Sequence, residues 1–220
     1  MSLRRIYTLT VVVRRAHQKS NVLKLAEDPN MLILTCHVTY WDRFGWKDIF
    51  AKSAFDQRQW EYATALRRKN VFTPQVIVNG QVDGVGHNSR DLQVLITKGN
   101  AFSTAQTMEI LYMIHGGGIT VSGLGNEHGV VSVIRYDDRD HDGSITHGEN
   151  NGRKLRHSHI VKDVTHVGSW SGGFQSYALP PLQRGGEKVA VLVHAGAGGP
   201  IIGAARIKEA EGLDLREDTL

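Results

Sequence analysis

The sequence predicts an α/β fold in which a first half of alternating strands and helices is followed by a β-rich half of antiparallel strands. Over residues 1–99, apolar runs with strand spacing alternate with runs that have helical spacing. Pro74 stands directly before a short apolar strand, and after Gly99 the chain changes to short apolar runs separated by glycines. Alternation of this kind is typical of sheets with parallel strands, and short strands with glycine-rich turns are typical of sandwiches.

The elements of the first half follow the order strand, helix, strand, helix, strand, strand, helix. We expect strands at 5–13, 31–38, 75–78 and 81–84, and helices at 21–27, 50–68 and 90–98. Asn79-Gly80 is a specific two-residue hairpin signal, and Asn88 or Ser89 can cap the last helix. Trp60 and Tyr62 are expected to cover the sheet. This order is that of a thioredoxin-like region, in which the Thr73-Pro74 bond is expected to be cis.

The second half, residues 100–209, is predicted to be an antiparallel, sandwich-like unit. Its expected strands lie at 108–114, 119–122, 130–135, 160–167, 174–179, 189–194 and 201–207. Residues 210–220 are polar and charged, so we expect them to form a tail.

Composition narrows the classes of function. The formal net charge of the 220 residues is +4, and the basic residues are scattered, which disfavours nucleic-acid binding. No apolar run reaches the roughly twenty residues of a membrane span. Thr8 and Thr10 interrupt the first apolar stretch, so it predicts an exposed or edge strand instead of a signal peptide, and the chain as written is expected in the cytoplasm. The sequence gives no oligomeric state.

Two blocks of residues resemble a known family. They are His37-Val38-Thr39-Tyr40-Trp41-Asp42 with Gly45-Trp46-Lys47-Asp48, and Phe72-Thr73-Pro74-Gln75 with Val78-Asn79-Gly80. Both are similar to blocks of a mostly bacterial family, often periplasmic or secreted, that is catalogued as domain of unknown function 1223. Thr39 stands where that family usually has Asp. The resemblance implies a thioredoxin-like fold, thiol–disulfide oxidoreductase chemistry and protein or peptide thiol clients.

In such a fold, the loop after the second strand should lie beside Thr73-Pro74, where ligands of open α/β sheets tend to bind. We therefore expect a substrate-binding face built from His37, Tyr40, Trp41, Asp42, Trp46, Thr73 and Pro74. The alternative is a packed loop with both tryptophans in the core, which is a common role for large aromatics.

The Cys-x-x-Cys that the resemblance implies after the first strand is missing. Cys36 is the single cysteine, and it stands in an apolar run typical of a buried strand. Disulfide exchange needs an attacking thiolate and a resolving partner, so we assign no catalytic residue to the chain as written. Shifted codons across Val11–Ser20 permit Gly-Cys-Ser-Ser-Cys-Pro-Pro, so a frameshift and true divergence both remain explanations.

An acidic segment of the second half matches the EF-hand loop pattern. Its oxygen ligands would be Asp138, Asp140, Asp142, Ser144 and Glu149. The flanking sequence is β-like instead of helical, so a solvated acidic hairpin turn is the alternative. His157 and His159 would share one face of a strand, but no third and fourth ligand accompanies them, which favours a structural role.

Two functions follow from these observations. The first is family-level thiol–disulfide oxidoreductase chemistry, inactive in the chain as written because the dithiol is missing. The second is a non-catalytic interaction protein, with calcium as the one cofactor that the acidic loop suggests. The sequence does not decide whether this protein is an enzyme.

Overall fold

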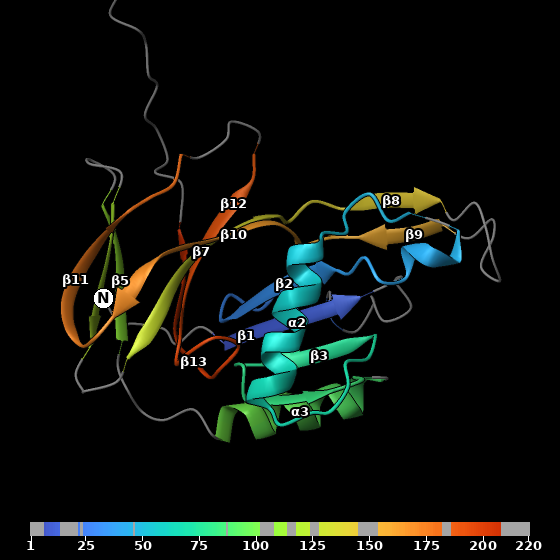
Figure 1. Cartoon of the computed structure of the whole chain (residues 1–220), viewed down its shortest axis with the longest axis horizontal. Helices are drawn as coiled ribbons and strands as arrows, with labels where there is room; N and C mark the ends of the chain where they lie inside the picture. Colours follow the sequence, from blue (N-terminus) through green and yellow to red (C-terminus); the bar gives the residue numbers. More distant parts are fainter. Residues whose placement is uncertain are drawn as a thin grey trace, which may run out of the picture.

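The computed structural model shows an α/β protein with a mixed sheet and two smaller antiparallel sheets (Figure 1). It describes residues 7–13, 22, 24–45, 47–86, 88–101, 108–113, 118–123, 128–144, 154–181 and 186–207. Among these residues, the mixed sheet has eight strands in the order β13-β12-β7-β10-β2-β1-β3-β4. No described helix is long and apolar enough to cross a membrane.

One end of the large sheet comes from the first half of the chain. Its elements are β1 (Tyr7–Val13), β2 (Met31–His37), the 3-10 helix η1 (Asp42–Phe44), α2 (Ser53–Ala65), β3 (Gln75–Val78), β4 (Val82–Gly84) and α3 (Ser89–Ala101). β1 pairs in parallel with β2 and antiparallel with β3. Asn79 (φ 50°) and Gly80 (φ 65°) form the predicted turn between β3 and β4, and both are left-handed. Val78 pairs with Val82, so the connection has three residues instead of the predicted two.

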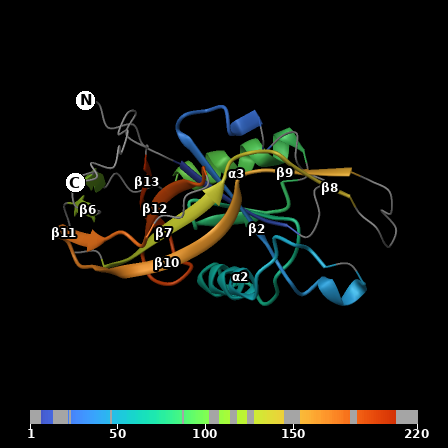
Figure 2. The same ribbon diagram turned by 90° about the horizontal axis from the view of Figure 1, so that it is seen from above.

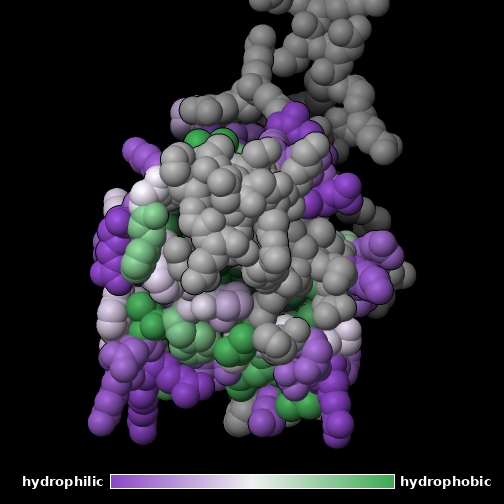
Figure 3. Space-filling model, turned by 90° about the vertical axis from the view of Figure 1, so that its right-hand side faces the viewer, coloured by the Kyte–Doolittle hydropathy of each residue, from purple (hydrophilic) through white to green (hydrophobic). Residues whose placement is uncertain are grey.

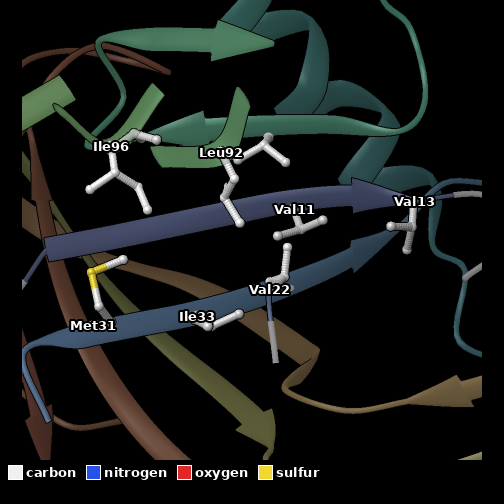
Figure 4. Close-up of a cluster of buried hydrophobic side chains, with 9 residues drawn as sticks. Val11, Val13, Val22, Met31, Ile33, Leu92 and Ile96 are labelled. Atoms are coloured by element: carbon white, nitrogen blue, oxygen red, sulfur yellow. The ribbon is translucent and has the colours of Figure 1, made fainter. Parts of the chain in front are cut away.

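The helices α2 and α3 cover opposite faces of this end of the sheet (Figure 2). Leu92 and Ile96 of α3 pack on alternate residues of β1 to β3, as Figure 4 shows for Val11 and Ile33. Asn88 caps α3, because its Oδ1 accepts the Asp91 N–H at 2.9 Å. On the other face, Phe55 and Tyr62 of α2 are 2% and 0% exposed.

The rest of the large sheet comes from the second half of the chain. Its strands are β7 (Gly129–Asp137), β10 (Ile160–Trp170), β12 (Lys188–His194) and β13 (Ile201–Ile207). β10 joins the two halves, because Ile160 pairs in parallel with Thr35 of β2. The remaining strands form two antiparallel sheets, one of β5 (Met108–Met113), β6 (Gly118–Gly123) and β11 (Gly173–Ala178), the other of β8 (His141–Ser144) and β9 (Lys154–His157).

The β5-β6-β11 sheet packs face to face on β7, β10 and β12 around the fully buried Trp170. This is sandwich-like packing, as predicted, but one of its two layers is the large sheet itself. The two regions predicted on either side of residues 99 and 100 therefore contribute strands to the same large sheet. The expected tail, 210–220, lies outside the described residues.

Several predictions about single elements can be compared directly with the structure. The Thr73-Pro74 bond is cis, as expected. The prediction of an exposed or edge first strand was wrong, because β1 lies between β2 and β3. Its two threonines are buried, and the N–H and hydroxyl of Thr8 both donate to Asn79 Oδ1. The prediction for Trp60 was also wrong, since its side chain is 47% exposed.

Asn79 forms hydrogen bonds with three separate parts of the chain. Besides accepting from Thr8, its side-chain amide donates to the Gly99 carbonyl of α3 at 3.3 Å. Its backbone carbonyl accepts the Ile201 N–H of β13 at 2.8 Å. The hairpin turn is therefore a junction between the first strand, the last helix of the first half and the last described strand.

Candidate functional site

The loop between β2 and α2, residues 38–52, lies beside Thr73-Pro74, as the sequence predicted. Trp41 Nε1 donates to Thr73 Oγ1 at 2.9 Å, so the two residue blocks meet through a direct hydrogen bond. We call the exposed surface of Tyr40, Trp41, Phe44, Thr73 and Pro74 the loop face. Figure 3 views the right-hand side of Figure 1 and shows hydrophobic surface among hydrophilic side chains on that side of the molecule.

Helix α2 fixes the inner side of this face. Gln59, which is 1% exposed, accepts a hydrogen bond from the Tyr40 hydroxyl at 3.1 Å. Its amide donates to the Phe72 carbonyl and to Gln75 Oε1, both at 2.8 Å. Burial raises the pKa of the Tyr40 phenol, although its hydrogen bonds to Thr73 and Gln59 oppose the shift. Tyr40 is therefore a neutral hydrogen-bonding group at physiological pH.

The outer side of the loop face is apolar and partly exposed. Phe44 is 54% exposed and contacts the Trp41 ring at a centroid distance of 5.5 Å. Arg43 lies over the Phe44 ring at 5.1 Å, and Ile49, further along the loop, is 84% exposed. Trp46, predicted as part of the face, lies outside the described residues. The sequence did not single out Phe44 or Ile49, because an isolated apolar loop residue carries no periodic signal.

His37, which the sequence placed on the face, is buried behind it and anchors the loop, and the partly exposed Asp42 contributes to the same anchoring. His37 is 0% exposed, and its Nδ1 lies 2.7 Å from Asp48 Oδ2. The other Asp48 oxygen accepts the Phe50 N–H at 2.9 Å, and Asp42 Oδ1 accepts the Asp48 N–H at 3.2 Å. Burial by itself would raise the pKa of Asp48, yet the hydrogen bond and charge of His37 and the Phe50 N–H hold that pKa below its ordinary value.

Three histidines surround Phe50 at the end of this loop. The Phe50 ring centroid lies 5.5 Å from that of His37, 5.6 Å from His157 and 5.5 Å from His141. His37 and His157 are themselves 5.0 Å apart, and Lys162 Nζ lies 4.9 Å from the Phe50 centroid. We call Phe50 and these three histidines the histidine cluster. It joins the loop to β2, β8 and β9, and no local pattern in the sequence could have revealed it.

The prediction that His157 and His159 share a strand face was wrong. β9 ends at His157, and His159 has a left-handed backbone (φ 53°) that turns its ring onto Tyr136, with the centroids 6.4 Å apart. A single left-handed residue breaks the two-residue period on which the prediction depended. Of these two histidines, only His157 belongs to the histidine cluster.

Asp137 anchors the side of the cluster nearest the solvent. Its carboxylate accepts from Arg139 Nε and Nη2, both at 2.8 Å, and lies 2.9 Å from His141 Nε2. The Arg139 hydrogen bond is the main reason that the pKa of Asp137 lies far below its ordinary range. This carboxylate therefore binds a guanidinium and an imidazole at the same time.

The predicted calcium ligands lie in the β8–β9 hairpin and its approach. Residues 141–144 are extended as β8 and pair with 154–157, while Arg156 lies 3.5 Å from Asp140 and 4.0 Å from Asp142. Asp138 precedes the hairpin, the Ser144 side chain is not described, and Glu149 lies outside the described residues. Within the described residues, no group of three or more His, Cys, Asp or Glu could hold a metal ion. Calcium binding stays a prediction.

Cys36 is buried in β2, as predicted, at 3% exposure. Burial raises the pKa of its thiol to about 11, even though the nearby Arg58 opposes the shift. The thiol is therefore protonated at neutral pH and is a poor nucleophile.

A second buried polar group, missed by the sequence analysis, links α2 to β12. Arg58 Nη2 lies 3.0 Å from the Tyr62 hydroxyl and 3.2 Å from His194 Nε2. Burial, assisted by the Arg58 charge, lowers the pKa of His194 well below its ordinary value. Loop residue Gly198 packs directly on the α2 backbone, since a Cβ there would lie 2.3 Å from the Glu61 carbonyl carbon.

Comparisons with other proteins match the chain over most of its length. A family model described as protein of unknown function (DUF1223) matches residues 15–194. The crystal structure of protein AGR_C_4864 from Agrobacterium tumefaciens is similar, with a TM-score of 0.75 and 23% sequence identity over 96% of this chain and 98% of that one. At that identity the similarity concerns the fold alone. A comparison with curated proteins gave no match.

Proposed function

Since this chain belongs to the DUF1223 family, whose function is unknown, we propose that it is a thioredoxin-like protein that binds extended polypeptides without thiol–disulfide exchange. The strand order β2-β1-β3-β4, with helices on both faces, agrees with a thioredoxin-like region. The remaining four strands of the large sheet extend this region at the β2 edge.

The backbone of Thr73 carries this proposal. Hydrogen bonds among the described residues reach Thr73 only through its side chain, and the residue is half-buried beside Trp41. β3 itself is paired with β1 on one side and β4 on the other, so an added strand has no room there. A client chain could pair only with the segment before β3, where the Thr73 N–H and C=O remain for strand addition.

The aromatic residues of the loop face would supply most of the affinity for a client polypeptide. Tyr and Trp combine large contact area with few rotatable bonds and are the common anchors of binding surfaces. The Phe44 ring, beside Trp41, extends this surface toward the solvent. Polypeptide clients with apolar side chains are therefore the ligand class that this face fits best.

Redox inactivity of this chain follows from its thiol chemistry. The one cysteine of the sequence is Cys36, and its raised pKa keeps it protonated. A lone buried thiol has no resolving partner for disulfide exchange. We expect no acceleration of insulin reduction by dithiothreitol when the purified chain is added, and turnover above the uncatalysed rate would contradict this part of the proposal.

Binding can be tested with reduced, carboxymethylated insulin B chain, an extended polypeptide without free thiols. Isothermal titration calorimetry at pH 7.5 should detect binding, and Phe44→Ser should weaken it at least about tenfold, as loss of an aromatic anchor does. Trp60→Ala removes an aromatic of similar exposure from the outer side of α2 and should leave the affinity unchanged. Absence of binding, or equal losses in both variants, would refute the proposal.

A further inference from the structure

The segment that carries the loop face holds most of the excess positive charge of the protein. Residues 38–73 contain seven Lys and Arg against four Asp and Glu, which is a net charge of +3 out of the +4 of the whole chain. This segment runs from the end of β2 through the loop and α2 to Thr73, so all of the loop face except Pro74 belongs to it. Its cations and its carboxylates differ in exposure and in bonding.

The carboxylates of the segment are mostly used inside the protein. Asp48 is 5% exposed and lies 2.7 Å from His37 Nδ1. Asp56 of α2 accepts hydrogen bonds from both the N–H and the hydroxyl of Thr39. Asp42 accepts the Asp48 N–H at 3.2 Å. Three of the four carboxylates are therefore hydrogen-bonded within the loop or between the loop and its neighbours.

The cations nearest the loop face are exposed instead. They are Arg43 and Lys47 in the loop, and Arg67 and Lys69 in the connection that follows α2. Among the described residues, none of these four takes part in an ion pair. Arg43 lies over the Phe44 ring at 5.1 Å, so a cation borders the exposed aromatic directly. A negatively charged ligand could bind these cations without displacing a carboxylate of the protein.

The length of the connecting chain limits how far these charges lie from the face. Lys47 follows Phe44 by three residues, so their Cα atoms are at most about 11 Å apart. Lys69 precedes Thr73 by four residues, which gives a limit of about 14 Å. Charges are screened over about 8 Å at physiological ionic strength and over about 30 Å at 0.01 M. The cations are therefore close enough to act on a ligand at the loop face, most strongly at low salt.

We propose that the loop face selects acidic polypeptides: an extended client whose apolar side chains contact the aromatic residues and whose Asp and Glu side chains lie beside Arg43, Lys47 and Lys69. This inference rests on the proposed function and specifies the class of client. Each exposed ion pair changes an affinity by only a few-fold, so the aromatic contacts supply most of the binding. The charges supply selectivity, as complementary charges at the edge of an interface do.

Two forms of reduced insulin B chain test the charge preference. Alkylation with iodoacetate places a carboxylate on each cysteine, whereas iodoacetamide places a neutral amide there, and the sequence is otherwise the same. Isothermal titration calorimetry at pH 7.5 and about 0.01 M ionic strength should show at least about threefold tighter binding of the carboxymethylated form. Salt at about 1 M should abolish the difference.

The outcomes of this titration separate the two proposals. Equal affinities of the two peptides at low salt would overturn the preference for acidic clients and leave the proposed function intact. Absence of binding of either peptide would overturn the proposed function and the preference with it. Tighter binding of single-stranded oligothymidylate than of either peptide would assign the cations to nucleic acid and overturn the preference as well.

A matched pair of double variants separates local charge from net charge. Arg43→Gln combined with Lys69→Gln should abolish the preference and leave the affinity for the neutral peptide unchanged. Arg90→Gln combined with Lys98→Gln removes the same charge from exposed positions of α3, on the opposite face of the sheet from α2 (Figure 2), and should retain the preference. An equal loss of preference in both double variants would show an effect of net charge alone and overturn the proposal.

Discussion

Two buried polar clusters among the described residues are built around a histidine, and they differ in the groups that lie against the ring. His37 lies against a carboxylate, Asp48, and beside a second imidazole. His194 lies against a guanidinium and a phenol, and its pKa is depressed. The first cluster offers the ring a carboxylate, whereas the second places a cation against the ring, disfavours its protonation and joins α2 to β12. Burial of a histidine therefore does not by itself indicate its role, but the charge of its partners does.

The largest expected effect concerns the His194 cluster. Gly198→Ala places a Cβ against the Glu61 carbonyl at a residue with φ +62°, so the loop after β12 must move away from α2. We expect a loss of about 3 kcal/mol or more in the free energy of unfolding, measured with urea. Gly196→Ala is the control, because that residue is also left-handed (φ +83°) but has open space around it. Its cost should stay near 1 kcal/mol, and equal losses would show that the packing on α2 is unimportant.

Asp48→Asn tests the His37 cluster with a change that preserves shape. The amide keeps an oxygen for His37 but loses the charge, and we expect a loss of about 2 kcal/mol in the free energy of unfolding. Asp91→Asn, on the exposed first turn of α3, should cost less than 1 kcal/mol. Because the pKa of Asp48 is depressed in the folded state, its stabilisation is present above the unfolded pKa of about 3.9 and is lost as the pH falls below that value. The Asn variant should lack this part of the acid dependence.

The contribution of the His194 cluster to stability is expected to change at a higher pH than that of Asp48. The pKa of His194 is depressed in the folded state, so folding favours its neutral form. The contribution of His194 to the free energy of unfolding is therefore fully present above its unfolded pKa of about 6.5. Below that value, stability should fall by up to about 1.4 kcal/mol per pH unit for this one group until His194 itself titrates. His194→Gln should reduce the slope of the free energy of unfolding between pH 6.5 and 5. An unchanged slope in the variant would assign that dependence to other groups.

Calcium is expected to have the smallest effect. Residues 141–144 are paired as a strand that also carries His141 of the histidine cluster, so a wrapped EF-hand loop would have to break this pairing. We expect 1 mM CaCl₂ to leave the melting temperature unchanged in differential scanning fluorimetry. An increase of several degrees that is lost in Asp140→Asn would restore the calcium-loop interpretation and connect the ion to the His37 cluster.

Local signals in the sequence predicted much of the fold. The Asn79-Gly80 hairpin, the cap of α3 and most strands after residue 100 follow from patterns a few residues long, and the structure confirms them. The central position of β1 was missed because Thr8 looks polar, although Asn79, 71 positions away, satisfies it. Long-range hydrogen bonds of this kind leave no trace in the local pattern.

Local patterns in the sequence likewise predicted only part of the candidate site. The proximity of Trp41 and Thr73 follows from the order of the strands, and the structure confirms it. The anchoring role of His37 does not follow, because its neighbours Asp48, Phe50 and His157 come from the loop and from a hairpin of the second half. A single residue with φ 53°, His159, decided which of two histidines faces the cluster.

The pairing of β2 with β10 has a consequence for the growing polypeptide on the ribosome. β2 is complete at His37, but the strand that covers its outer edge begins only at Ile160. At ordinary rates of translation, that edge stays unprotected for on the order of ten seconds. During this interval the apolar run from Met31 to Cys36 is an open template for pairing with another nascent chain. We therefore expect synthesis of this protein, more than its finished form, to depend on chaperones.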